Sequence, residues 1–211
     1  NMGCPVPKIY KNGEGSALME KPKLAEKIVS ECVKSGKVIT VKTRIGIHEG
    51  DKQVYELAKA VENGGASAIT VHGRVKDAYY SGDVDFESIA RVKQSVKIPV
   101  IANGGVFDKH SCDELKEKTG ADGIMIARGS IGKPWIFAEV TGKEARVDVK
   151  NEMLNHLNAL STAFGEKYAC TNFRKFFAYY LKGIPCKEQK IRLMTACSLA
   201  EINEIISEID F

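Results

Sequence analysis

Short apolar runs recur at almost regular intervals through the first two thirds of the chain. β-branched residues dominate these runs, which occupy residues 38–41, 68–71, 98–101 and 123–126. Nearly continuous runs of this kind are typical of strands buried on both faces of a sheet. Val41 and Val71 lie 30 residues apart, Val71 and Ile101 another 30, and Ile101 and Ile126 a further 25. The spacing leaves room for one helix between successive strands and predicts a parallel sheet of βα units.

The segments between these runs carry the period of an amphipathic helix. Glycines stand at 36, 64, 65 and 120, where such helices are expected to end. We interpret the apolar stripes of these segments as faces that pack on the core. Two of the stripes are Leu24, Ile28 and Cys32, with Val29 and Val33 alongside, and Val54, Leu57, Ala58 and Val61.

Polar residues follow each predicted strand, and their position separates two kinds of α/β fold. In a (βα)8 barrel these positions face the catalytic mouth. An open doubly wound sheet with a dinucleotide site would carry G-x-G-x-x-G after its first strand, and the sequence has no such motif there. The pattern therefore favours a barrel. The strand-end residues are Lys42, Arg44, His72, Arg74, Asn103 and Arg128.

The rhythm changes after about residue 146, because helical stripes continue but no further apolar strand follows. We therefore expect a barrel-type domain over 1–146, a polar linker over 141–146 and a helical domain over 147–211. The helical domain has no net charge, yet six basic residues face one acidic residue between 174 and 192. The sequence predicts a local basic face on this domain.

Composition narrows the class of protein. The 211 residues are 44% hydrophobic and 27% charged, which is typical of a globular protein and not of a disordered or fibrous one. No apolar run approaches the ~18 residues of a membrane span, and the first residues contain no secretory signal. The six cysteines show no metal-like spacing, so we expect reduced thiols, no metal and a cytoplasmic location. The net charge of +4 permits an anionic partner.

Two glycine-containing turns could bind phosphate. Asn103-Gly104-Gly105 follows the third strand, and Ala127 with Arg128 follows the fourth. Glycines let backbone N–H groups approach a phosphate closely, and barrels often bind phosphate after their last strands. The alternative is that the glycines only make tight turns.

Three further side chains could carry chemistry. Lys42 would stabilise the negative charge of a reduced flavin, or else pair with a carboxylate. His72 would donate to a phosphate or act as an acid, or else serve as hydrogen-bonded structure. Cys4 lies in a sharp turn, where it is either a packed residue or a proton donor, because a free thiol of pKa near ~8.5 is mostly protonated at neutral pH.

Taken together, these motifs resemble the tRNA-dihydrouridine synthase family, in its bacterial B-type branch. The resemblance spans nearly the whole chain, and the motifs are specific jointly rather than singly. They are N-M-G-C-P-V-P-K at 1–8, G-E-G-S-A-L at 13–18, V-K-T-R-I-G at 41–46, V-H-G-R at 71–74, with Y-S-G at 80–82, I-A-N-G-G at 101–105, D-G-I-M-I-A-R-G at 122–129, G-K-P-W-I-F at 132–137 and F-R-K-F-F-A-Y-Y-L-K-G-I-P at 173–185.

The resemblance implies reduction of a tRNA uridine at its C5–C6 bond, with FMN as cofactor and NADPH as reductant. It makes Cys4 the acid that protonates C5 while the flavin delivers hydride to C6. The flavin-binding residues that it implies are Lys42, His72, Asn103, Gly104, Gly105, Ala127 and Arg128.

tRNA is the partner that the resemblance implies. A stacked uridine must be extruded to reach a flavin, so contacts elsewhere must offset that cost. An ordinary helix with aromatic residues inside and solvated lysines outside remains the alternative for the basic face. The RNA-binding residues expected are Lys8, Arg74, Arg174, Lys175, Lys182 and Arg192.

The chain departs from the family in one respect. Family barrels have eight βα units, whereas the sequence predicts only the last four, followed by the helical domain. A half barrel would expose two sheet edges, so we expect either a partial chain or two copies that pair into a closed barrel. Two other functions stay open: a flavin barrel acting on a free pyrimidine, and a tRNA-binding fragment without activity.

Overall fold

The computed structural model describes residues 1–144 and 146–211, so position 145 of the predicted linker lies outside the described residues. The chain forms two compact units, Asn1–Arg128 and Gly129–Phe211. The boundary between these units falls before the change of sequence rhythm at residue 146. Each unit is described by itself.

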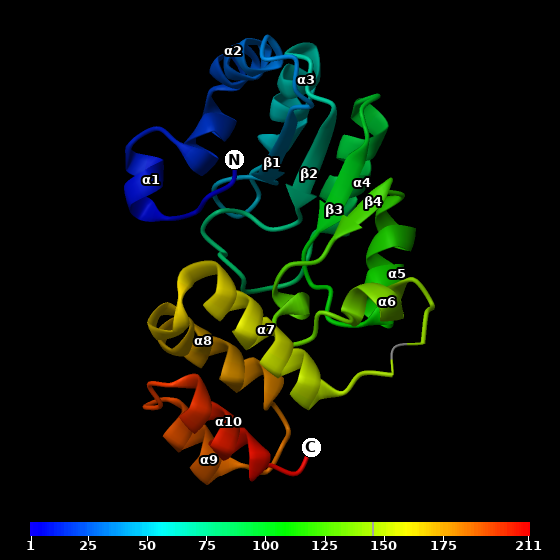
Figure 1. Ribbon diagram of the computed structural model, residues 1–211. Coiled ribbons are helices and arrows are strands. Elements are labelled where there is room, and N and C mark those ends of the chain that lie inside the picture. Colours follow the sequence, from blue (N-terminus) through cyan, green and yellow to red (C-terminus); the bar gives the residue numbers. More distant parts are fainter. Residues whose placement is uncertain (145) are drawn as a thin grey trace. The chain divides into compact units, whose positions relative to one another are not determined.

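The first unit is built on a four-stranded parallel sheet in the order β1-β2-β3-β4 (Figure 1). The predicted α/β class with a parallel sheet is therefore confirmed. Each strand lies within three residues of its predicted run, and β1 begins after Val38, which is 78% exposed. The strands are β1 (Thr40–Arg44), β2 (Ala68–His72), β3 (Val100–Asn103) and β4 (Gly123–Met125).

Helices separate the strands along the chain, as the spacing predicts. The stripe on α3 is confirmed, since Val54, Leu57, Ala58 and Val61 are fully buried. The elements of this unit are α1 (Pro7–Lys11), η1 (Gly15–Glu20), α2 (Pro22–Val33), α3 (Val54–Asn63), α4 (Phe86–Ser95) and α5 (Lys109–Thr119).

The stripe predicted on α2 is only partly confirmed. Val29 of that stripe is buried, but Leu24, Ile28 and Cys32 are exposed, and the helix buries Ala25 beside Val29. The reason is the close approach of α2 to the end of α3: a Cβ on Gly64 would lie 3.0 Å from Val29 Cβ. Only a glycine lets the two helices come this near, and that contact decides which face of α2 is buried.

The second unit is helical and has its own core. Met153 and Leu157 of the predicted stripe are fully buried, and they meet Phe173 and Phe177 there. A short turn, η2 (Arg128–Ser130), spans the boundary between the units. The helices are α6 (Ile136–Val140), α7 (Val149–Phe164), α8 (Glu166–Tyr180), α9 (Lys187–Leu193) and α10 (Leu199–Ser207). None of the helices described in either unit is long and apolar enough to cross a membrane.

The helical core gives a stability prediction. Phe173→Ala should lower the free energy of unfolding of this unit by about 3–5 kcal/mol, because it removes a fully buried ring and leaves a cavity. Trp135, the single tryptophan, packs against this core, so its fluorescence in a urea titration reports this unit. Phe164→Ala is the control, because that ring is 64% exposed and its loss should change stability little. Equal losses in the two variants would contradict the assignment of the core.

Candidate functional site

The carboxyl edge of the sheet brings three polar side chains into one row. The parallel register aligns Arg44 with His72, and His72 with Asn103. Each of the three is at most 6% exposed. Asn103 Nδ2 donates a 2.8 Å hydrogen bond to the carbonyl of Met125, which ties the row to β4. Residues more than 25 positions apart in sequence therefore meet at one buried edge.

His72 is neutral at this edge. Burial, and then the charges of Arg44, Lys42, Arg74 and Arg128, lower the pKa of His72 from 6.5 to about 3. Arg74 Nη1 lies 3.2 Å from His72 Nε2. A guanidinium can only donate, so Nε2 accepts and the imidazole proton is on Nδ1.

The charges around His72 are mostly positive, although the carboxylate of Asp83 acts on Arg74. Burial and then Arg44 lower the pKa of Lys42, while burial and then Arg128 lower the pKa of Arg74. Within the described residues, none of the four cations forms an ion pair with a carboxylate. Arg44 and Arg74 are buried, Lys42 is half-buried and Arg128 is exposed, and a group of cations without a direct ion pair is suited to bind an anion.

An aromatic ring lies among these cations. The centroid of the Tyr80 ring is 4.4 Å from the guanidinium carbon of Arg128, 5.7 Å from that of Arg44 and 6.2 Å from the His72 ring. The Tyr80 side chain comes from the loop after β2, and the preceding Tyr79 has a φ of 48°. A positive φ at a tyrosine is uncommon and marks a constrained turn.

The glycines after β3 are required by packing. A Cβ on Gly104, whose φ is +127°, would lie 2.9 Å from His72 Cδ2. A Cβ on Gly105, whose φ is +72°, would lie 3.1 Å from Val84 Cγ2. Packing against His72 at Gly104, packing against Val84 at Gly105 and a positive φ at both therefore explain the two glycines, and their contact with phosphate stays a prediction.

The Cys4 turn is attached to β1. Met2 forms a parallel bridge with Thr43, and its N–H donates to the carbonyl of Lys42 at 2.8 Å. Thr43 Oγ1 donates to the carbonyl of Met2 at 3.1 Å. The turn is therefore aligned with the strand that carries Lys42 and Arg44.

Arg44 anchors the same turn from its other side. Its Nε donates to the carbonyl of Gly3 at 3.2 Å, and its Nη1 donates to that of Val75 at 2.9 Å. Ser16 Oγ donates to the carbonyl of Cys4 at 2.8 Å. Cys4 is partly exposed, so a held turn presents its thiol beside the cationic edge.

The comparisons with known proteins decide the family. A family model described as dihydrouridine synthase matches residues 1–210. The chain belongs to the dihydrouridine synthase family. A probable tRNA-dihydrouridine synthase of Rickettsia conorii is 40% identical over 195 residues, which are 88% of this chain and 59% of that protein.

Two further relatives agree with this. tRNA-dihydrouridine synthase B of Vibrio parahaemolyticus is 39% identical, over 86% of this chain and 60% of that protein. A probable tRNA-dihydrouridine synthase of Mycobacterium tuberculosis H37Rv is 38% identical, over 88% of this chain and 51% of that protein. The chain therefore spans between 51% and 60% of the length of these curated relatives.

Among the site residues that the family resemblance implies, the structure brings Cys4, Lys42, His72 and Arg74 together with Arg128. Ala127 and Lys8 are exposed, the first after β4 and the second on α1. Sequence reasoning left Arg44 and Tyr80 out of its site, although both stand in motifs that it quoted. In the described part of the chain, no three or more His, Cys, Asp and Glu residues cluster as metal ligands would.

The predicted basic face of the helical unit is only partly available. Arg174 Nη2 donates to the carbonyl of Ala196 at 3.4 Å, and Arg192 forms two hydrogen bonds of 2.5 and 2.9 Å to Glu208. Lys175 and Lys182 are exposed. The RNA contacts of all four basic residues stay predictions.

His72 gives a titration prediction. With its pKa near 3, the imidazole should stay neutral from pH 8 down to pH 5, which NMR of its ring nitrogens would measure. The unfolded chain, with an ordinary pKa near ~6.5, binds more protons below that pH. The free energy of unfolding should therefore fall as pH drops from about 6.5 towards 3, and less steeply in His72→Gln. A ring that titrates near pH 6.5 in the folded protein would contradict this.

Proposed function

We propose that this chain takes part in the reduction of uridine to 5,6-dihydrouridine in tRNA, with FMN as cofactor and NADPH as reductant. The observation that carries the proposal is the group of cations around neutral His72, next to the anchored Cys4 turn. Its members are Lys42, Arg44, Arg74 and Arg128. The tRNA-dihydrouridine synthase names of the relatives support the reaction and the substrate.

We further propose that the four βα units are the second half of a (βα)8 barrel. The parallel sheet and its order, with one strand after another along the chain, support this. In such barrels the catalytic groups lie at the carboxyl ends of the strands, which is where the cationic group is found. The barrel domain is proposed to end near residue 146, before the helical domain.

The residues present fit FMN. Its phosphate is a dianion, and the four cations around His72 form no ion pair with a carboxylate in the described part of the chain. Arg128 and the backbone after β3 would hold this phosphate, and Lys42 would stabilise negative charge on the reduced ring. Bound FMN, reduced by NADPH, would supply the hydride that adds to C6 of the uracil.

Cys4 is the proposed acid. The thiol gives its proton to C5 as hydride adds to C6, so the C5–C6 double bond becomes single and the product carries two added hydrogens. The thiol becomes a thiolate in this step. Proton uptake from solvent then restores the thiol. His72 stays uncharged throughout and can donate a hydrogen bond from Nδ1.

tRNA is the proposed partner of the helical unit. Lys175 and Lys182 are exposed and have no carboxylate partner among the described ion pairs. Lysines of this kind make phosphate contacts, which offset the cost of extruding a base from the folded RNA. A tRNA substrate implies a cytoplasmic location for this reaction.

Flavin binding tests the phosphate site. FMN and riboflavin differ only by the phosphate, so the chain should bind FMN more tightly in a fluorescence-quenching titration. Arg128→Ala should weaken FMN binding by about tenfold or more, as expected when a charged hydrogen bond is lost, and leave riboflavin binding unchanged.

Lys109→Ala is the matched control, because that lysine pairs with Asp113 on the surface of α5 and should not affect FMN. Equal affinities for FMN and riboflavin would reject the phosphate site.

Turnover tests the acid. Cys4→Ala should reduce dihydrouridine formation in tRNA by about 100-fold or more, because it removes the proposed proton donor. The absorbance change of the flavin on reduction by NADPH should stay near normal. Cys32→Ala, at an exposed cysteine on α2, is the control and should turn over normally. Unimpaired product formation by Cys4→Ala would show that the acid is another group, and comparable reduction of free uridine would argue against tRNA as substrate.

A further inference from the structure

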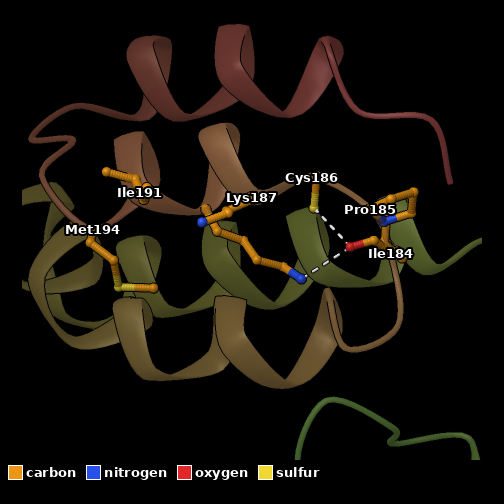
Figure 2. A pocket seen from close by; sticks show the side chains of 7 residues that line it. Ile184, Pro185, Cys186, Lys187, Ile191 and Met194 are labelled. Atoms are coloured by element: carbon orange, nitrogen blue, oxygen red, sulfur yellow. Dashed lines mark hydrogen bonds between the residues drawn. The ribbon is translucent and has the colours of Figure 1, made fainter.

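One face of α9 borders a hollow in the helical unit. Lys187, Lys190, Ile191 and Met194 have the i, i+3, i+4, i+7 spacing that places side chains on one side of a helix. Together with the turn before α9 they line a cavity of about 570 Å³ (Figure 2). The turn contributes Ile184, Pro185 and Cys186. We refer to this hollow as the α9 groove.

The α9 groove presents apolar surface that the core of the unit does not use. Leu193 of the same helix is fully buried, whereas Ile191 is 62% exposed. Met194 packs partly against the core and partly lines the groove. An isoleucine this exposed beside a methionine and a proline offers apolar surface to a ligand.

The charged side chains that line the α9 groove are positive, namely Lys187 and Lys190. Lys190 Nζ donates to the carbonyl of Ile184 at 3.1 Å, which holds the ammonium at the wall (Figure 2). No Asp or Glu is among the residues that line it. Glu188, the acidic residue of α9, instead interacts with Arg192 and helps to raise the pKa of that guanidinium. The ligand that suits the groove is therefore anionic and has an apolar face.

We propose that the α9 groove binds one nucleotide of tRNA, with the base against Ile191 and Met194 and the flanking phosphates on Lys187 and Lys190. Isoleucine, methionine and proline side chains pack against base faces in other nucleic-acid complexes. Lysines act as point charges on phosphates. The choice of RNA over an acidic peptide rests on the proposed function and on the further exposed lysines of the same unit, Lys175 and Lys182.

The test uses unfractionated tRNA as the probe and measures its affinity for the 211-residue chain at several salt concentrations. Ile191→Ser should weaken binding by about tenfold, as expected when an apolar side chain that packs on a base is lost, without changing the salt dependence. Lys187→Ala should weaken binding and lower the salt slope by about one.

Two variants outside the groove are matched controls. Phe164→Ser removes an equally exposed apolar side chain at the end of α7 and should bind as the unmodified chain does. Lys182→Ala removes the same charge as Lys187→Ala and should lower the salt slope similarly. Both Ile191 and Phe164 are more than 60% exposed, so these variants should fold, which circular dichroism would check.

The outcomes separate this proposal from the proposed function. If Ile191→Ser binds tRNA normally while both lysine variants bind it weakly, the groove proposal is overturned and the tRNA-binding basic face stands. The groove would then suit an acidic protein segment better than RNA. If the unmodified chain does not bind tRNA at all, both proposals fail for this chain.

Discussion

Parallel register is the constraint on which the candidate site depends. Because all four strands run the same way, their last residues meet at one edge, and side chains from three different βα units become neighbours there. Arg44, His72 and Asn103 are buried at this edge, so the charge of Arg44 is poorly screened by water, whereas Arg128 is exposed. Their effect is visible in His72, which becomes a very weak base and remains uncharged. A cluster of this kind attracts anions, which is why the site proposed for this chain includes the phosphate of FMN.

The Cys4 turn is held at this edge because it forms hydrogen bonds with residues of β1 and η1. Arg44 both anchors the Cys4 turn and contributes to the cationic group. Its guanidinium donates to the carbonyl of Gly3 and also adds to the charge around His72. Thr43, on the same strand as Arg44, donates a hydrogen bond to the carbonyl of Met2, the residue before Gly3. A proton donor on a mobile loop would spend most of its time out of reach, and attachment to a strand avoids that loss. The thiol and the cations are therefore positioned by the same few residues.

Some basic residues of the helical unit form hydrogen bonds within the unit, and others lie on its surface. Arg174 and Arg192 satisfy a carbonyl and a carboxylate of their own unit, while the lysines at 175, 182 and 187 project outward. A guanidinium can make several directed hydrogen bonds at once and suits such internal contacts. An ammonium on a flexible stem remains hydrated and free to meet phosphates. The local excess of positive charge in the sequence is therefore larger than the charge that the unit presents to a partner.

The order of apolar and polar residues along the sequence determined the α/β class, the four strands and the polar residues at their ends. A strand buried on both faces must be apolar throughout, and a helix must repeat its apolar positions every three to four residues, so both patterns can be read without the fold. Only the tertiary structure decided which face of α2 is buried, because that depends on a glycine 35 residues beyond Val29. It also decided that Tyr80 lies among the cations, that Arg192 pairs with Glu208, and that α9 leaves Ile191 uncovered. Each of these depends on which distant residue comes close in space, and the periodicity of a segment holds no information about its neighbours.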